Sequence, residues 1–217
     1  MNKIIEITIG LVMLIACSSN NISTGFNLKD YYFPYNDFFE SKTYCYVNAI
    51  DTTDKSYWIM QTKIEGKDTL FLTNIHDSHH KLTEELVEKI EKNGSIMVKY
   101  TLYKNDNNGQ ISAPCEVIDS VIFKWSQNID ESIVWKVDFP EFSSKQTIEF
   151  TKKRTLTSID SMNSLATFKD KNSMIMKGAF QKNEYEIENS YKKGIGLINY
   201  KIIGQGRVLK DYKLNIK

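Results

Sequence analysis

Apolar and polar residues alternate along most of this chain, and no other feature of the sequence restricts its fold as strongly. The alternation is clearest in residues 96–103, 133–139, 185–191 and 207–216. A period of two residues is that of a β-strand with one buried face and one face in water. The sequence therefore predicts a protein built mainly of strands.

Shorter apolar segments and the turn residues between them complete this prediction. The further predicted strands are residues 43–50, 56–64, 68–75, 115–125, 147–151, 174–181 and 195–203. Segments rich in glycine, asparagine or charged residues predict turns at 65–67, 105–109, 170–172 and 204–206. Because short turns join antiparallel neighbours, we expect an antiparallel sheet.

One segment has a helical period instead. Over residues 83–92, Thr83 can cap the start of a helix and Asn93-Gly94 can end it. One side of that helix would be apolar, with Leu82, Leu86, Val87 and Ile90. We therefore expect a mainly β fold: a curved antiparallel sheet, either a half barrel or an open barrel, with one short amphipathic helix over its concave or open side.

Length and composition narrow the function classes. A chain of 217 residues with 41% hydrophobic residues is sufficient for one domain with a core. The formal net charge is +1, and only Arg154 and Arg207 among the 28 basic residues are arginines. Since readout of bases and phosphates relies on arginine forks, we expect no nucleic-acid partner.

The amino-terminal residues have the pattern of an export signal. Ile7–Ala16 is uncharged, follows Lys3, and is followed by Cys17 and a polar stretch. A helix that crosses a bilayer needs about 20 apolar residues, so this segment is too short to be a permanent span.

Leu14-Ile15-Ala16-Cys17 resembles the lipobox of bacterial lipoproteins, in which a small residue precedes a cysteine. The resemblance implies that Cys17 is the lipid attachment residue, that residues 1–16 are a lipoprotein signal peptide, and that the chain is held to a membrane by its lipid. Residues 17–27 would then be a flexible tether and residues 28–217 a single β-rich domain. Serine beside Cys17 resembles the outer-membrane class of Gram-negative lipoproteins, which implies a location on the outer membrane, facing the periplasm.

A second resemblance lies near the other end of the chain. Tyr191-Lys192-Lys193-Gly194-Ile195-Gly196-Leu197-Ile198 is similar to a segment of uncharacterised bacterial lipoproteins, some of which are built on half barrels. Gly194 and Gly196 are interpreted as structural, because missing side chains allow a bulge or a sharp bend at the start of a strand.

The chain has two cysteines in addition to Cys17. Cys45 and Cys115 both lie in predicted strands. Two buried free thiols and one disulfide both agree with this placement, and an exported protein permits either.

All three histidines lie in His76-Asp77-Ser78-His79-His80. Such a cluster can ligate Zn²⁺ or Cu²⁺, although it lacks the His-Glu-x-x-His register and also fits a solvated loop. No Gly-x-Ser-x-Gly motif is present, so a serine hydrolase has no support.

Two other segments have both a functional and a structural interpretation. The aromatic residues of 31–39 can stack on sugar rings, or they can fix the start of the domain to its core. Lys152-Lys153-Arg154 can contact anionic headgroups, or it can be a solvated strand edge.

The leading functional hypothesis is a membrane-anchored, non-enzymatic accessory or binding domain that can hold an apolar ligand between sheet and helix. One alternative is a carbohydrate-contacting surface module that uses residues 31–39. Another is a metal-dependent enzyme at the loop 76–80. The expected partners are the membrane, through the lipid, and a lipid, a glycan or an envelope protein. The sequence assigns no catalytic, metal-binding or cofactor-binding residue and no cofactor.

Overall fold

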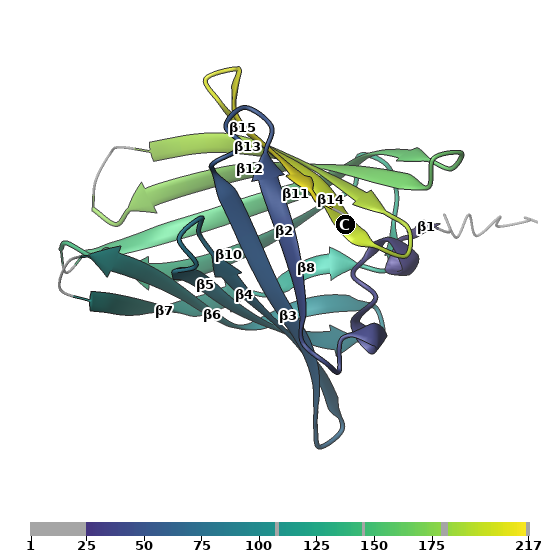
Figure 1. Cartoon of the computed structure of the whole chain (residues 1–217), viewed down its shortest axis with the longest axis horizontal. Helices are drawn as coiled ribbons and strands as arrows, with labels where there is room; N and C mark the ends of the chain where they lie inside the picture. The colour runs from purple at the N-terminus through teal and green to yellow at the C-terminus, as the bar shows by residue number, and fades with distance from the viewer. Residues whose placement is uncertain (1–24, 107–108, 145, 179–181, 216–217) are drawn as a thin grey trace, which may run out of the picture.

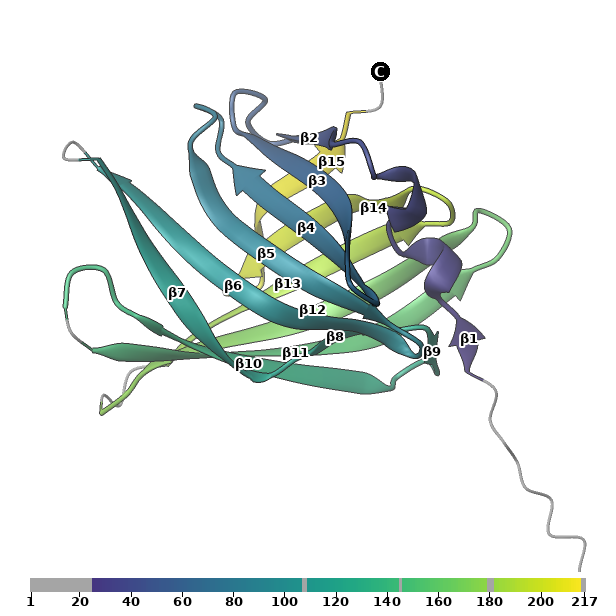
Figure 2. The ribbon, with the colours of Figure 1, turned by 90° about the horizontal axis from the view of Figure 1, so that it is seen from below.

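A computed structural model describes residues 25–106, 109–144, 146–178 and 182–215 (Figures 1 and 2). The expected signal peptide, Cys17 and most of the expected tether lie outside these described residues. Gly25, Phe26 and Asn27, the last residues of that tether, are described, and Phe26–Asn27 pairs with another strand.

The described residues form a closed β-barrel of 12 strands, all neighbouring pairs being antiparallel. In chain order these strands are β2 (Lys42–Asn48), β3 (Lys55–Glu65), β4 (Asp68–His76), β5 (Leu82–Glu91), β6 (Gly94–Asp106), β7 (Gly109–Asp119), β10 (Ser132–Pro140), β11 (Thr147–Asp160), β12 (Leu165–Met176), β13 (Lys182–Lys192), β14 (Gly196–Gly204) and β15 (Arg207–Leu214).

Two pairings close the ring. β5 pairs with both β4 and β6, and β15 pairs with β2, the first strand of the barrel. The β15–β2 contact is short, with Tyr212, Lys213 and Leu214 opposite Asn48, Val47 and Tyr46. Between β7 and β10, β8 (Val121–Lys124) turns back to pair with the start of β6.

The amino-terminal segment closes one end of this barrel. β1 (Phe26–Asn27) pairs with β9 (Ser126–Gln127), and two short 3₁₀ helices follow, η1 (Lys29–Tyr31) and η2 (Tyr35–Asp37). We call residues 28–38 the plug. Its backbone is bonded to three parts of the wall: the Leu28 N–H donates to the Trp125 carbonyl, the Gly194 N–H to that of Asp30, and the Thr62 N–H to that of Phe38.

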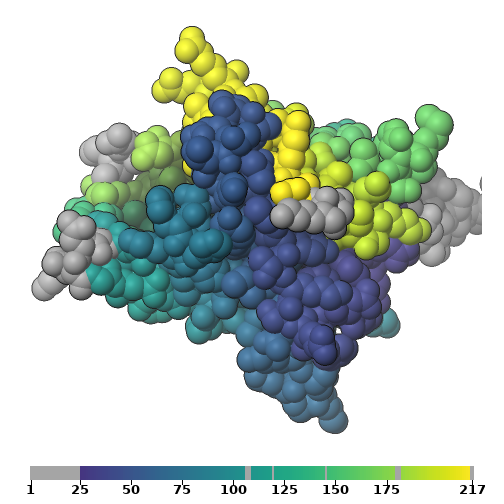
Figure 3. Space-filling model, viewed as in Figure 1, coloured from purple at the N-terminus to yellow at the C-terminus, as the bar shows by residue number. Residues whose placement is uncertain are grey.

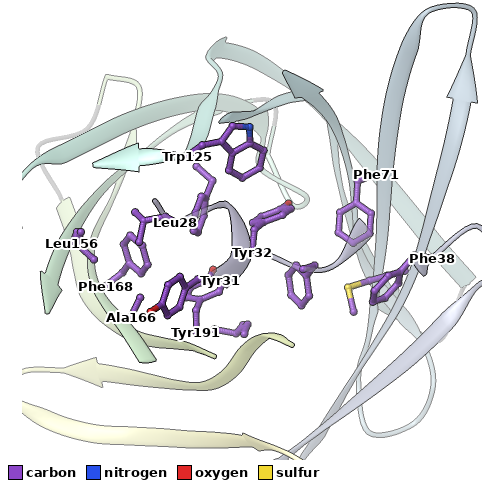
Figure 4. Packing of buried hydrophobic residues seen from close by; sticks show 14 of the residues in the cluster. Leu28, Tyr31, Tyr32, Phe38, Phe71, Trp125, Leu156, Ala166, Phe168 and Tyr191 are labelled. Carbon is purple, nitrogen blue, oxygen red and sulfur yellow. The ribbon is translucent and has the colours of Figure 1, made fainter. Parts of the chain in front are cut away.

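The main hydrophobic core lies between the plug and the strands that surround it. Leu28, Tyr31, Tyr32, Phe33 and Phe38 are all buried there. Figure 4 shows the plug rings inside the ring of strands, with Tyr32 between residues of opposite walls. The Tyr32 ring meets those of Phe123 and Trp125 edge-on, at centroid distances of 5.0 and 5.4 Å. Aromatic pairs at this spacing add to the stabilisation from buried area.

The expected alternation is confirmed where one strand face is apolar. In β10, Ile133, Trp135, Val137 and Phe139 are buried, as the pattern predicts. The turns predicted at 65–67 and 204–206 lie between β3 and β4 and between β14 and β15. The predicted strand 115–125 is divided at Ser120 into β7 and β8.

The predicted helix over residues 83–92 is wrong. This segment is β5, and the described residues contain no α-helix. Glu84, Leu86 and Glu88 face the barrel interior, because each contributes to the lining of the interior cavity. Because two carboxylates occupy its inward face, the strand shows no alternation of apolar and polar residues. Its apolar residues Leu82, Leu86, Val87 and Ile90 instead recur at the spacing of a helix.

The prediction of a half barrel or open barrel is wrong for a related reason. β5 supplies the wall that the expected helix would have covered, so the sheet closes on itself. A closed barrel leaves no unpaired strand edge, which an open sheet would have to protect.

The predicted turn at 170–172 is also wrong, and the predicted strand 174–181 begins too late. Asp170, Lys171 and Asn172 lie in the middle of β12, which ends at Met176. Asp170 and Asn172 are nearly fully buried inside the barrel. Polar residues that face a barrel interior give the same sequence pattern as residues of a turn.

Candidate ligand-binding site

The barrel encloses a cavity of about 530 Å³, which the plug closes at one end. A volume of this size is typical of sites for small molecules. Tyr32 and Phe33 of the plug form its floor. Apolar and aromatic side chains from opposite walls line much of it, including Trp58, Trp135, Phe150 and Tyr200. We call this cavity the lumen.

The lumen extends toward the end of the barrel that the plug leaves open. Its lining includes Asp54 at the end of the β2–β3 connection, Lys55 at the start of β3, Asp77 after β4, and Lys210 of β15. Lys210 pairs with Asp54 at 3.0 Å, and the Tyr212 hydroxyl donates to Asp54 at 2.8 Å. Figure 2 shows the strands ending in separate loops at this side, while the amino-terminal segment enters at the opposite side. We call the open end the mouth.

The plug lies against the wall where the chain enters. In the space-filling view the purple amino-terminal segment packs beside the β3–β4 hairpin (Figure 3). Gly196 has a φ of +97°, and a methyl group in its place would overlap the Phe33 ring. Gly194 also has a positive φ, +75°, so the backbone at both glycines agrees with the structural interpretation, and Gly196 allows the plug to approach β14.

A buried ion pair crosses β11 and β12 inside the barrel. Arg154 and Asp170 are direct partners in the strand register, and the guanidinium binds both carboxylate oxygens, at 2.9 and 2.8 Å. Asn189 of β13 donates to the same carboxylate at 2.9 Å. Burial alone would lower the pKa of Arg154, but the charge and hydrogen bonds of Asp170, together with the nearby Tyr191 and Tyr32, outweigh it, and the pKa is raised.

A buried carboxyl group joins the plug to the wall. Glu88 of β5 accepts hydrogen bonds from the Tyr32 hydroxyl of the plug and from the Ser95 hydroxyl of β6. Burial raises the pKa of Glu88, since these two bonds and the charge of Arg154 offset the desolvation of the carboxylate only in part.

Other polar groups are placed nearer the mouth. The Tyr100 hydroxyl donates to Glu84 at 2.7 Å. The buried Nδ1 of His76 has no hydrogen-bond partner among the residues that the structure describes. Such an atom is available to a polar group of a bound molecule.

The aromatic residues of 31–39 are fixed to the core, which is the structural alternative for this segment. Tyr31, Tyr32, Phe33 and Phe38 are buried, and only Phe39 is a largely exposed ring, at 54%. The segment therefore offers no row of exposed rings for a sugar, which removes the support that the carbohydrate hypothesis took from it.

The histidine loop does not bring its imidazoles together. Asp77 accepts bonds from the backbone N–H groups of His79 and Lys81, which makes a tight turn. The His80 ring stacks on Tyr57, with centroids 4.3 Å apart, while His76 lines the lumen. Within the described ranges, no three His, Cys, Asp or Glu side chains are grouped so as to hold a metal ion.

Cys45 and Cys115 are both free thiols, each partly exposed. Burial raises the pKa of the Cys115 thiol to about 11. A thiol with a raised pKa is a weak nucleophile, which fits a structural role.

The interpretation of Lys152-Lys153-Arg154 as a solvated edge is wrong for two of the three residues. β11 is an interior strand of the ring, and Lys152 and Arg154 face the lumen while Lys153 is exposed. The group formed by Lys152, Arg154, Asp170 and Glu88 is not predicted from the sequence. One signal was available: residues of like charge two positions apart in a strand share a face.

The described residues contain no helix that is long and apolar enough to cross a membrane. No protein-family model matches the chain, and no curated protein matches it.

The chain is similar to two solved structures of low sequence identity. The first is a protein of Bacteroides fragilis, described as a candidate exported protein with a YmcC-like fold; the TM-score is 0.51 at 9% identity, over 80% of this chain and 92% of that one. The second is a candidate lipoprotein of Parabacteroides distasonis, with a TM-score of 0.46 at 8% identity, over 81% of this chain and 94% of that one. The first similarity is one of fold.

Proposed function

We propose that this protein is a lipid-anchored binding protein of the bacterial envelope that holds an amphipathic small molecule in its lumen. The observation that carries the proposal is the lumen itself, a cavity of about 530 Å³ closed by the plug and lined by aromatic rings and charged groups. This interior is a cavity inside a closed barrel, and it is neither the expected apolar groove between sheet and helix nor a filled core.

The proposed location rests on the lipobox-like sequence at Cys17. The description of the Bacteroides fragilis protein as exported agrees with it. The described chain starts at the plug end, where β1 pairs with β9. A lipid on Cys17 would therefore hold the closed end of the barrel toward the membrane and direct the mouth away from it. We place the protein on the outer membrane, facing the periplasm.

The proposed binding can be tested with the uncharged fluorescent probe N-phenyl-1-naphthylamine and a variant that obstructs the lumen. Thr73 and Leu86 are cross-strand partners that both line the cavity, so the double variant Thr73→Trp/Leu86→Trp places two indoles in it. Asn74 and Glu85, the next pair along the same strands, serve as the control Asn74→Trp/Glu85→Trp, since successive side chains point to opposite faces.

We expect saturable binding of the dye to the unmodified protein and to the control, and at least about fivefold weaker binding to the lumen variant. Equal binding to all three proteins would place the dye on the outer surface and contradict the proposal. No binding to the unmodified protein would also contradict it.

A further inference from the structure

Most charged groups that face the lumen are held by a protein partner. Arg154 binds both oxygens of Asp170 and also donates to the Ile122 carbonyl at 3.2 Å. Glu88 accepts hydrogen bonds from two hydroxyl groups, and Glu84 accepts one from the Tyr100 hydroxyl. Hydrogen bonds of this kind offset the cost of removing a charge from water.

Lys152 is different. Its Nζ lies 3.9 Å from Asp170 Oδ2, beyond hydrogen-bond distance, and among the described residues the ammonium has no hydrogen-bond acceptor. Asp170 already accepts two bonds from Arg154 and one from Asn189. The Lys152 side chain is only 19% exposed, so water replaces the missing acceptors incompletely.

Two aromatic rings lie beside the ammonium. Nζ lies 4.9 Å from the centroid of the Trp135 ring and 5.9 Å from that of Phe150. Both rings line the lumen. The ring faces attract a cation, but they accept no conventional hydrogen bond, and they offer an apolar surface directly beside it.

The electrostatics of the site agree with this geometry. Burial lowers the pKa of Lys152, and the attraction of Asp170 only partly opposes the effect, while Arg154 adds to it. The charged form of Lys152 is thus less well stabilised here than it would be in water. An anionic oxygen from a bound molecule would supply what the protein does not.

We infer that the lumen takes an anionic amphiphile, whose carboxylate, sulfonate or phosphate group binds Lys152 while its apolar body packs on the rings of Trp135 and Phe150. This inference rests on the proposed function, because it names the chemistry of the molecule that the lumen holds. Lys152 lies inside the barrel, so the anionic group of the molecule has to enter the lumen.

Two dyes that differ by a single anionic group test it. N-phenyl-1-naphthylamine is uncharged, and 8-anilino-1-naphthalenesulfonate has the same ring system with a sulfonate. The variant Lys152→Met keeps an unbranched side chain that is one atom shorter and removes its charge. Lys153→Met is the matched control, since it removes the same charge from the outer face of the same strand.

We expect Lys152→Met to bind the sulfonate dye at least about tenfold more weakly than the unmodified protein does, and the neutral dye within about twofold. Lys153→Met should bind both dyes as the unmodified protein does. If Lys152→Met lowered the affinity for both dyes equally, Lys152 would have only a packing role. If the affinity for both dyes stayed unchanged, Lys152 would not belong to the site. Either result overturns the inference.

A second measurement needs no variant. Decanoate and decanol have the same chain, and only decanoate is an anion. We expect decanoate to displace N-phenyl-1-naphthylamine from the unmodified protein at a concentration at least about tenfold lower than decanol does. Equal displacement would overturn the inference and leave the proposed function intact, whereas failure of the neutral dye to bind at all would contradict the proposed function.

Discussion

Glu88 shows how a single residue links the plug to the barrel wall. Its carboxyl group is buried and accepts the hydroxyl of Tyr32 from the plug and that of Ser95 from β6. A carboxyl group in this environment binds a proton more readily than one in water, so the free energy of unfolding depends on pH through it.

The sign of this dependence can be worked out. Burial raises the pKa of Glu88 in the folded protein above its unfolded value, so Glu88 favours folding below the unfolded pKa and loses that contribution as pH rises through the folded pKa. Glu88→Gln keeps the shape and removes the titration. We therefore expect the stability of Glu88→Gln relative to the unmodified protein to improve between pH 4 and pH 7.

Urea unfolding at a series of pH values measures this difference. Glu85→Gln, in the same strand but on its outer face, is the control and should not reproduce the trend. A relative stability of Glu88→Gln that stays constant or falls over this range would contradict the assignment.

At the scale of elements, the strands with an apolar inward face could be predicted from the sequence. β10 is such a strand. The inward faces of β3 and β4 are mixed, with Thr62 and Thr73 buried beside apolar residues, but the turn at 65–67 marks the hairpin that joins them. β5 and β12 could not be predicted in this way, because Glu84, Glu88, Asp170 and Asn172 occupy inward positions. Those inward polar residues belong to the candidate site or support it. The features that hid the two strands are therefore the ones that build the site.

The plug is an element whose fit depends on a glycine. At Gly196 both the φ of +97° and the contact with the Phe33 ring exclude a side chain. We expect Gly196→Ala to lower the free energy of unfolding by about 2–4 kcal/mol, from backbone strain and overpacking together. Gly206 has a similar φ of +74° but open space around it, so Gly206→Ala should cost only about 1–2 kcal/mol.

Denaturant unfolding of both variants checks the comparison. If Gly196→Ala lowered the free energy of unfolding by no more than Gly206→Ala does, the plug would not be packed closely against β14.

At the scale of the whole molecule, the barrel has one closed end and one open end. The chain enters at the closed end, so the plug separates the lumen from the side on which the anchor is expected. The lipobox-like sequence predicts that anchor, and the aromatic residues of 31–39 indicate a segment fixed to the core. The closure of one barrel end by that segment and the lumen behind it could not be predicted, because both depend on contacts between distant parts of the chain such as Tyr32 with Glu88.

The anchor can be tested by labelling. We expect cells that express the chain to incorporate radiolabelled palmitate into it, and Cys17→Ser to abolish at least about 90% of this label, since only a thiol forms the thioether. Cys45→Ser is the control, and it should leave the label unchanged. Label that persists in Cys17→Ser, or a mature protein that still carries residues 1–16, would contradict the prediction.

The short β15–β2 contact also has a consequence for the order in which the protein folds. It joins residues 46–48 to residues 212–214, whereas most other neighbours in the ring are joined by short turns. Bringing together partners so distant along the chain costs more entropy than forming a hairpin. The hairpins can form early and locally, but β2 remains without its second neighbour until β15 arrives. We therefore expect ring closure to be a late and slow event in folding, before which the unpaired edges of β2 and β15 can pair with other chains.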